Sequence, residues 1–89
     1  MTVYLCWTDA ELPGSLRGPW VEWRIAGVGL VLVESDDTLS RVYHEIKWSL
    51  ADGAALIVAP LAARPKLKAL PPGTTSWLRD RLPPASGDA

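Results

Sequence analysis

The chain has 89 residues, which is enough for one domain and too few for a second core. Its hydrophobic content of 48% and charged content of 21% are typical of a globular protein and exclude a disordered chain. The net charge is -1, but the charges are unevenly distributed: acidic side chains predominate in residues 1–40 and basic side chains in residues 41–89. The acidic half argues against a nucleic-acid partner, because neutralising phosphates requires a concentrated basic surface.

The sequence predicts neither a membrane segment nor a disulfide. The longest apolar runs, residues 28–33 and 54–63, are far shorter than the ~20 residues that cross a bilayer. A strand pattern without a basic signal region follows Met1, so no membrane contact is expected. Cys6 is the single cysteine and has no partner for a disulfide or a cysteine-rich zinc site. We therefore expect a cytoplasmic protein.

Five tryptophans in a chain without phenylalanine are more aromatic bulk than so small an interior readily covers. Small single-core domains also gain stability by association. We therefore expect a homodimer.

The first predicted element is a buried strand over residues 2–8, which are rich in β-branched and aromatic side chains with apolar groups on both faces. Residues 9–19 contain prolines and glycines and predict a loop. Residues 20–26 alternate and favour a half-exposed strand, although a short helix after Pro19 is the alternative. One face of that strand carries Val21, Trp23 and Ile25, and the other carries Trp20, Glu22 and Arg24.

A continuous aliphatic run, residues 30–33, predicts a third strand that is covered on both faces. Gly27 and Gly29 allow a bend or bulge before it. The second and third strands are therefore either a hairpin or one bent strand.

An amphipathic helix is predicted over residues 37–50, because short oxygen-bearing side chains at residues 35–38 suit a helix start. Its apolar stripe consists of Leu39, Val42, Tyr43, Ile46 and Leu50. Asp52 and Gly53 form a turn, and residues 55–59 predict a buried fourth strand that ends near Pro60. The resulting strand, helix and strand over residues 28–61 form a compact βαβ core, right-handed if its strands are parallel.

A basic, proline-bounded segment and a short capped helix over residues 75–82 complete the chain. Residues 1–84 then form one α+β domain with the order β-β-β-α-β-α. We expect a four-stranded antiparallel or mixed sheet with one main helix on one face. Residues 85–89 are small and polar and are expected to be frayed.

The order of elements over residues 30–82 resembles small ferredoxin-like proteins related to the metal-dependent nuclease subunit of CRISPR adaptation complexes. Residues 4–9, Tyr-Leu-Cys-Trp-Thr-Asp, look like the first strand of that family, which ends in an aspartate used for metal binding at the dimer axis. The resemblance implies a ferredoxin-like fold and Asp9 as a metal ligand. The helix that the family has between its first two strands has no room in residues 10–19.

Asp9 and Glu11 are the candidate metal and catalytic residues. Carboxylates from two protomers suit Mg²⁺, which prefers oxygen ligands and activates water for phosphodiester attack. The alternative is that both side chains solvate a strand end. The leading expectation is therefore no catalytic residue, no metal and no cofactor.

The stripe formed by Arg41, His44 and Trp48 lies on the helix face away from the expected core. Tryptophan and arginine are favoured at interaction hot spots, so the stripe is a candidate interaction surface. Trp20 is expected to be a further exposed aromatic residue at such an interface. The alternative is a tryptophan folded flat over its neighbours.

The chain has one tight basic cluster, which consists of Arg64, Lys66 and Lys68. This cluster could contact an acidic partner or a phosphate, but three charges are too few for strong nucleic-acid binding. The alternative is that the three side chains belong to a solvated loop without a binding role. Cys6 in its apolar strand indicates an inert core thiol.

Three functions remain after these arguments. The first is a non-enzymatic homodimeric interaction module that uses its exposed tryptophans on itself or on a protein partner. The second is a metal-dependent nuclease-like protein that uses Asp9. The third is a regulatory domain that binds a small molecule, by analogy of fold alone.

Overall fold

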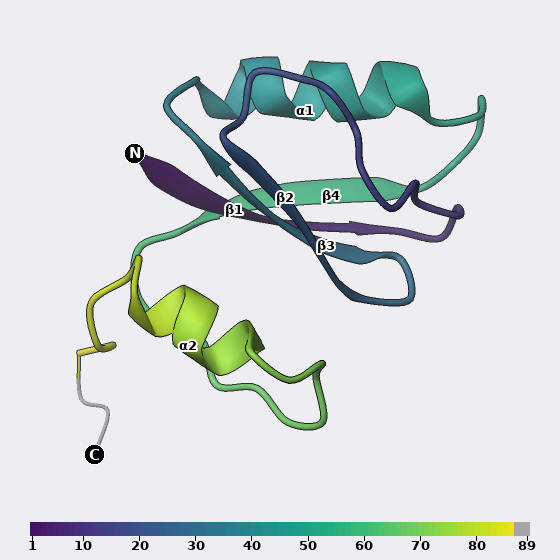
Figure 1. Ribbon diagram of the computed structural model, residues 1–89. Helices are drawn as coiled ribbons and strands as arrows, with labels where there is room; N and C mark the ends of the chain where they lie inside the picture. The colour runs from purple at the N-terminus through teal and green to yellow at the C-terminus, as the bar shows by residue number, and fades with distance from the viewer. Residues whose placement is uncertain (87–89) are drawn as a thin grey trace.

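The computed structural model describes residues 1–86 as a small α+β domain with four strands and two helices (Figure 1). Within residues 20–26 the strand begins at Glu22, and none of these residues forms the alternative helix. The elements are β1 (Thr2–Thr8), β2 (Glu22–Gly27), β3 (Leu30–Ser35), α1 (Leu39–Ser49), β4 (Leu56–Leu61) and α2 (Thr74–Arg79).

The sheet is open and antiparallel, with the strand order β2-β3-β1-β4. The first strand is therefore central: Val3 pairs with Glu34 of β3 on one side and with Leu61 of β4 on the other. Both neighbours run antiparallel to β1, so the two strands joined by α1 point in the same direction with β1 between them.

A tight hairpin joins β2 and β3, and the alternative of one bent strand is wrong. Gly29 in its turn has a φ of 69°, which favours glycine, and its carbonyl accepts a hydrogen bond from the Thr8 backbone N–H at 2.9 Å. A register shift between Ile25 and Gly27 places a bulge just before the turn, as the glycines predicted.

The sheet has a hydrophobic core on each face, because side chains alternate along its strands. Figure 1 shows α1 over one face and α2 against part of the other. The core under α1 contains Tyr4, Cys6, Val31, Val33, Val42 and Ile46. The core under α2 contains Val3, Ala26, Leu32, Trp77, Leu78 and Leu82. The expectation of one main helix on one face therefore omits this second layer.

Helix α1 begins two residues after the predicted start. Thr38 is the N-cap residue, and its hydroxyl accepts a hydrogen bond from the Arg41 backbone N–H. Leu39, which the periodicity assigned to the buried stripe, is 41% exposed, so that assignment is wrong. The Tyr4 hydroxyl donates to the Asp37 carbonyl at 2.7 Å and ties the helix entry to the central strand.

A polar cluster holds the C-terminal layer against the sheet. Glu22 and Glu34 are paired across β2 and β3, and Arg81 lies 3.6 Å and 3.1 Å from their carboxylate oxygens. The Arg81 guanidinium also covers the Trp77 ring at 4.0 Å, and the Trp77 indole N–H donates to Glu22 at 2.8 Å. This one cation stabilises a pair of like charges that would otherwise repel.

Strand β4 forms one edge of the sheet and includes Pro60. Proline has no backbone N–H to donate to a neighbouring strand, so it is tolerated in a strand at the edge of a sheet. The strand therefore continues through Pro60 to Leu61.

Helix α2 starts after Gly73, which provides no side-chain cap, and it is shorter than the predicted helix over residues 75–82. Residues 85 and 86 lie outside helices and strands, and the predicted fraying of 87–89 lies outside the described residues. Neither helix of this part of the chain has the length and apolarity to span a bilayer.

Candidate functional site

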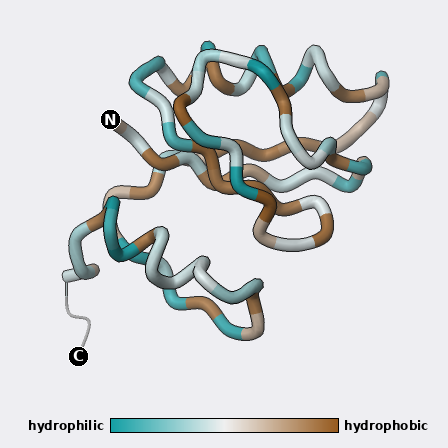
Figure 2. Tube along the Cα trace, viewed as in Figure 1, coloured by the Kyte–Doolittle hydropathy of each residue, from teal (hydrophilic) through white to brown (hydrophobic). Residues whose placement is uncertain are grey.

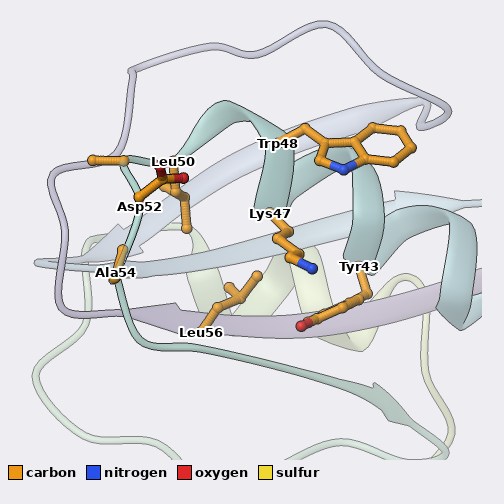
Figure 3. Close-up of a pocket in the computed structure, with 9 residues that line it drawn as sticks. Tyr43, Lys47, Trp48, Leu50, Asp52, Ala54 and Leu56 are labelled. Atoms are coloured by element: carbon orange, nitrogen blue, oxygen red, sulfur yellow. The ribbon is translucent and has the colours of Figure 1, made fainter.

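The most exposed aromatic side chain of the described residues is Trp48, which is 69% accessible. It stands near the end of α1 beside a hollow of about 370 Å³ between this helix, the following turn and β4 (Figure 3). The hollow is lined by Tyr43, Lys47, Trp48, Leu50, Ala51, Asp52, Gly53, Ala54 and Leu56. Two aromatic rings, two leucines and a few polar groups in one concavity are typical of a binding site.

The polar groups of this hollow give it a chemical character. Lys47 extends between Trp48 and Leu56 in Figure 3, and Tyr43 lies one helical turn before it. Lys47 forms no ion pair within residues 1–86, so its ammonium group is available to an incoming acid. Asp52 is at the other end of the hollow, where an acidic ligand group would be repelled.

The other members of the predicted stripe lie beside Trp48 or pair locally. The ring centroids of His44 and Trp48 are 5.7 Å apart, and the His44 Nδ1–H donates to the Ser40 carbonyl at 2.7 Å. Arg41 forms an ion pair with Glu45 at 3.4 Å. The structure therefore brings His44 and Trp48 together, whereas the guanidinium of Arg41 is engaged on its own helix.

Trp20 is half-buried, and the expectation that it is exposed is wrong. Its indole N–H donates to the Leu16 carbonyl at 2.6 Å, and its ring lies 5.3 Å from that of Trp23. The loop before β2 folds back onto the α1 side of the sheet, held by the Ser35 hydroxyl, which donates to the Pro19 carbonyl. The alternation of residues 20–26 gave no signal of this local loop packing.

The two candidate metal ligands lie where β1 leaves the sheet. The Asp9 Oδ1 accepts a hydrogen bond from the Ala55 backbone N–H at 2.8 Å, so this carboxylate holds the entry to β4. Glu11 is exposed nearby. Residues 1–86 contain no group of three or more histidine, cysteine, aspartate or glutamate side chains placed to hold a metal ion.

The three residues of the predicted basic cluster have different surroundings. Arg64 is half-buried, and its guanidinium donates to the carbonyls of Leu82 at 2.8 Å and Arg79 at 3.3 Å, where it satisfies groups at the end of α2. Lys66 and Lys68 are exposed on the segment that precedes α2. Arg64 therefore has a structural role at the end of α2, although it also lines a concavity together with Lys66.

Cys6 is 1% exposed in the core under α1, as its apolar strand predicted. Burial disfavours the charged thiolate and raises the pKa of this thiol from 9.0 to about 12. Because thiolate is the reactive form, the side chain is inert at neutral pH.

We expect an aromatic disulfide reagent at pH 8 to modify Cys6 at least about a thousandfold more slowly in the folded protein than in denaturant, because burial both blocks access to the thiol and raises its pKa to about 12. Below pH 9 the thiol is neutral in both states and does not affect stability; above pH 9 the unfolded thiol ionises while the buried thiol does not, so the free energy of unfolding falls as the pH rises toward 12. The measurement is the labelling rate at several pH values. Equal rates in both states would contradict the buried position.

Comparison of the chain with known protein families, with curated proteins and with solved structures finds no match. The candidate site is therefore defined by its own geometry. Sequence reasoning identified Trp48 but missed Lys47 and Leu56. They join Trp48 only because the turn after α1 brings β4 beneath the helix, and no spacing along the chain signals that placement.

Proposed function

We propose that the chain is a small homo-oligomeric interaction or regulatory module without catalytic activity, and that it binds a protein partner at Trp48 and the adjoining hollow. The observation that carries the proposal is the 69% exposure of Trp48 beside a concave, partly apolar surface. Removing a large aromatic side chain from water is favourable in free energy, and a partner that covers Trp48 would provide this gain. Tryptophan is also among the residues most enriched at binding hot spots.

The chemistry of the hollow favours a partner segment with an apolar side chain next to a carboxylate. The apolar group would lie against Trp48 and Leu56, and the carboxylate would meet Lys47 and the Tyr43 hydroxyl. A hydrogen-bonded charge pair at the edge of an apolar contact contributes specificity as well as affinity.

We expect a display library of short random peptides, selected on the immobilised protein, to enrich peptides with an aromatic or aliphatic residue beside Asp or Glu. Trp48→Ala should weaken binding of a selected peptide by about 2 kcal/mol, roughly 30-fold, because it removes the central aromatic contact. Titration calorimetry of the peptide measures this loss.

The matched control for Trp48→Ala is Leu39→Ala, which removes another exposed apolar side chain from the same helix outside the hollow. It should leave the affinity unchanged. Peptides that bind both variants and the parent protein equally, or a selection that enriches nothing, would contradict a binding site at Trp48.

We also propose that the chain has a ferredoxin-like arrangement that lacks the first helix of such folds. Through this arrangement we propose that it is related to the nuclease subunit of CRISPR adaptation complexes. In support, the two strands that α1 joins lie on either side of β1, as in a split βαβ unit. The loop over residues 9–21 takes the place of the first helix of such folds. A cytoplasmic location is part of this proposal and is supported by the single, buried cysteine.

The nuclease-like alternative stays a prediction and has less support. Asp9 already accepts a hydrogen bond from the Ala55 N–H, and a metal would need further ligands from a second protomer beside Glu11. Cleavage of DNA or RNA by the purified protein with Mg²⁺ or Mn²⁺, and its loss in Asp9→Asn, would favour this alternative over the interaction module.

A further inference from the structure

A hollow of about 290 Å³ lies between α2 and the segment that leads to this helix. The helix and the segment run side by side in Figure 1, on the opposite side of the sheet from α1. The charged residues that line the hollow are Arg64, Lys66 and Arg79, and no aspartate or glutamate of residues 1–86 lines it. We therefore call it the basic hollow.

The fold brings these cations together from two parts of the chain. Arg64 and Lys66 precede α2, and Arg79 is the last residue of this helix. The Arg64 guanidinium donates a hydrogen bond to the backbone carbonyl of Arg79 at 3.3 Å, so these two residues are in contact. Cations held in one concavity repel one another, and a bound anion would offset that repulsion.

Arg64 is a fixed hydrogen-bond donor in the hollow. Its side chain is half-buried, and its guanidinium donates to the carbonyls of Leu82 at 2.8 Å and Arg79 at 3.3 Å. A guanidinium has more N–H groups than these two bonds use, so others remain for a ligand. Because the two bonds hold the group in place, a ligand would bind without ordering a flexible side chain.

Arg79 provides a second donor group. It is exposed and forms no ion pair with any residue from 1 to 86. Its planar guanidinium can donate to two oxygens of a carboxylate or a phosphate at once. Thr75 adds a hydroxyl group to the lining, and Lys66 adds a third positive charge. The polar part of the hollow therefore suits an oxyanion.

The remaining walls of the hollow are apolar and consist of Pro65, Leu67 and Leu78. Figure 2 shows hydrophilic and hydrophobic residues in alternation along the segment before α2, which contributes both kinds of lining. At roughly 30 Å³ for each non-hydrogen atom, the share of one water molecule in the liquid, about ten such atoms would fill the hollow. This volume fits a small molecule, and three cations are too few for strong binding of a nucleic acid.

We propose that the basic hollow binds a small amphiphilic anion, in which a carboxylate or a phosphate is attached to a compact apolar group of about six carbon atoms. The oxyanion would meet the guanidinium groups of Arg64 and Arg79, and the apolar group would lie against Leu67 and Leu78. This site goes beyond the proposed binding of a protein partner at Trp48, which uses the α1 side of the sheet.

The test is a titration of the ¹⁵N-labelled full chain with phenyl phosphate and, separately, with 3-phenylpropionate, followed by NMR. Each ligand carries one of the two oxyanions on an apolar body and has about ten non-hydrogen atoms. We expect at least one to bind with a Kd of about 1 mM, as is typical of so small a ligand. It should shift the amide signals of Lys66, Leu67 and Thr75 and leave the indole signal of Trp48 in place. The ligand that binds more tightly identifies the oxyanion.

Arg79→Gln tests the contribution of the charge. It should raise the Kd of the tighter ligand about tenfold, because it removes a charge-assisted hydrogen bond from an exposed position. Lys68→Gln is the matched control, since Lys68 is exposed on the same segment as Lys66 and does not line the hollow. It should change the Kd less than about twofold. The NMR spectra also show whether both variants are folded.

The oxyanion without its apolar group tests the apolar walls. Inorganic phosphate or acetate should bind at least about fivefold more weakly than the corresponding ligand with the ring, because contact with Leu67 and Leu78 is lost.

Three results would overturn the proposal. They are the absence of saturable shifts at the hollow below about 10 mM of either ligand, equal binding by Arg79→Gln and Lys68→Gln, and an oxyanion that binds as tightly without the ring as with it. None of these results bears on peptide binding at Trp48, so the two proposals fail separately.

Discussion

Replacing Arg81 with methionine is expected to lower the free energy of unfolding by about 3 kcal/mol, and the melting temperature by roughly 12 to 24 °C in a domain of this size. The Arg81 guanidinium is the cation shared by Glu22 and Glu34, and it lies over the Trp77 ring. The Glu34 side chain is only 11% exposed, so without Arg81 a nearly buried carboxylate is left facing a second carboxylate. Methionine keeps much of the packing volume, so the loss reports the charge.

Denaturant unfolding followed by circular dichroism measures this change, and Arg79→Met is the matched control. Arg79 is the last residue of α2, two residues before Arg81, and it is exposed. It should cost less than about 0.5 kcal/mol. Adding Glu34→Gln to Arg81→Met should recover part of the loss by removing the buried charge, whereas equal stability of Arg81→Met and Arg79→Met would show that the cluster contributes nothing.

Gly29→Ala is expected to destabilise the fold by about 3 kcal/mol, through two effects at one turn. The backbone φ of 69° disfavours any residue with a Cβ atom. An added Cβ would also lie 2.2 Å from the Thr8 carbonyl oxygen, a backbone atom that cannot move without disturbing β1. Thermal unfolding of the variant measures the combined loss.

Gly53→Ala separates these two effects. Gly53 has a φ of 86° but no atom within 4 Å of an added Cβ, so the backbone preference acts alone. It should cost about 1 kcal/mol. If the two alanine variants are equally stable, the close approach to Thr8 has no energetic consequence and the argument for Gly29 is wrong.

Local patterns predicted the secondary structure well where one physical cause dominated. The β-branched and aromatic run at residues 2–8 matches β1, and the periodicity of residues 39–50 identified α1. The hairpin could only be narrowed to two alternatives, because glycine permits a bend as readily as a turn. Leu39 was misplaced because the helix begins at that residue and its side chain is left exposed in the first turn.

The second layer was harder to foresee, because long-range polar contacts build it. Arg81 follows α2 in the sequence, while Glu22 and Glu34 come from the first half of the chain. Nothing in the spacing of these charges indicates that they meet. The same limit applies to the candidate site: the exposed Trp48 could be predicted from the helix period, but the hollow beside it depends on how β4 passes beneath α1.

The central position of β1 also affects how the chain assembles. This strand precedes the other three in the sequence, yet the partners of Val3 are Glu34 and Leu61, which lie far downstream. Closing such distant pairs costs chain entropy before any contact compensates for it. A nascent chain that ends before β4 would leave one edge of β1 and the apolar side chains on both of its faces without cover. Native pairing of β1 must therefore wait until β4 is available, and folding should be slow relative to helical domains of equal length.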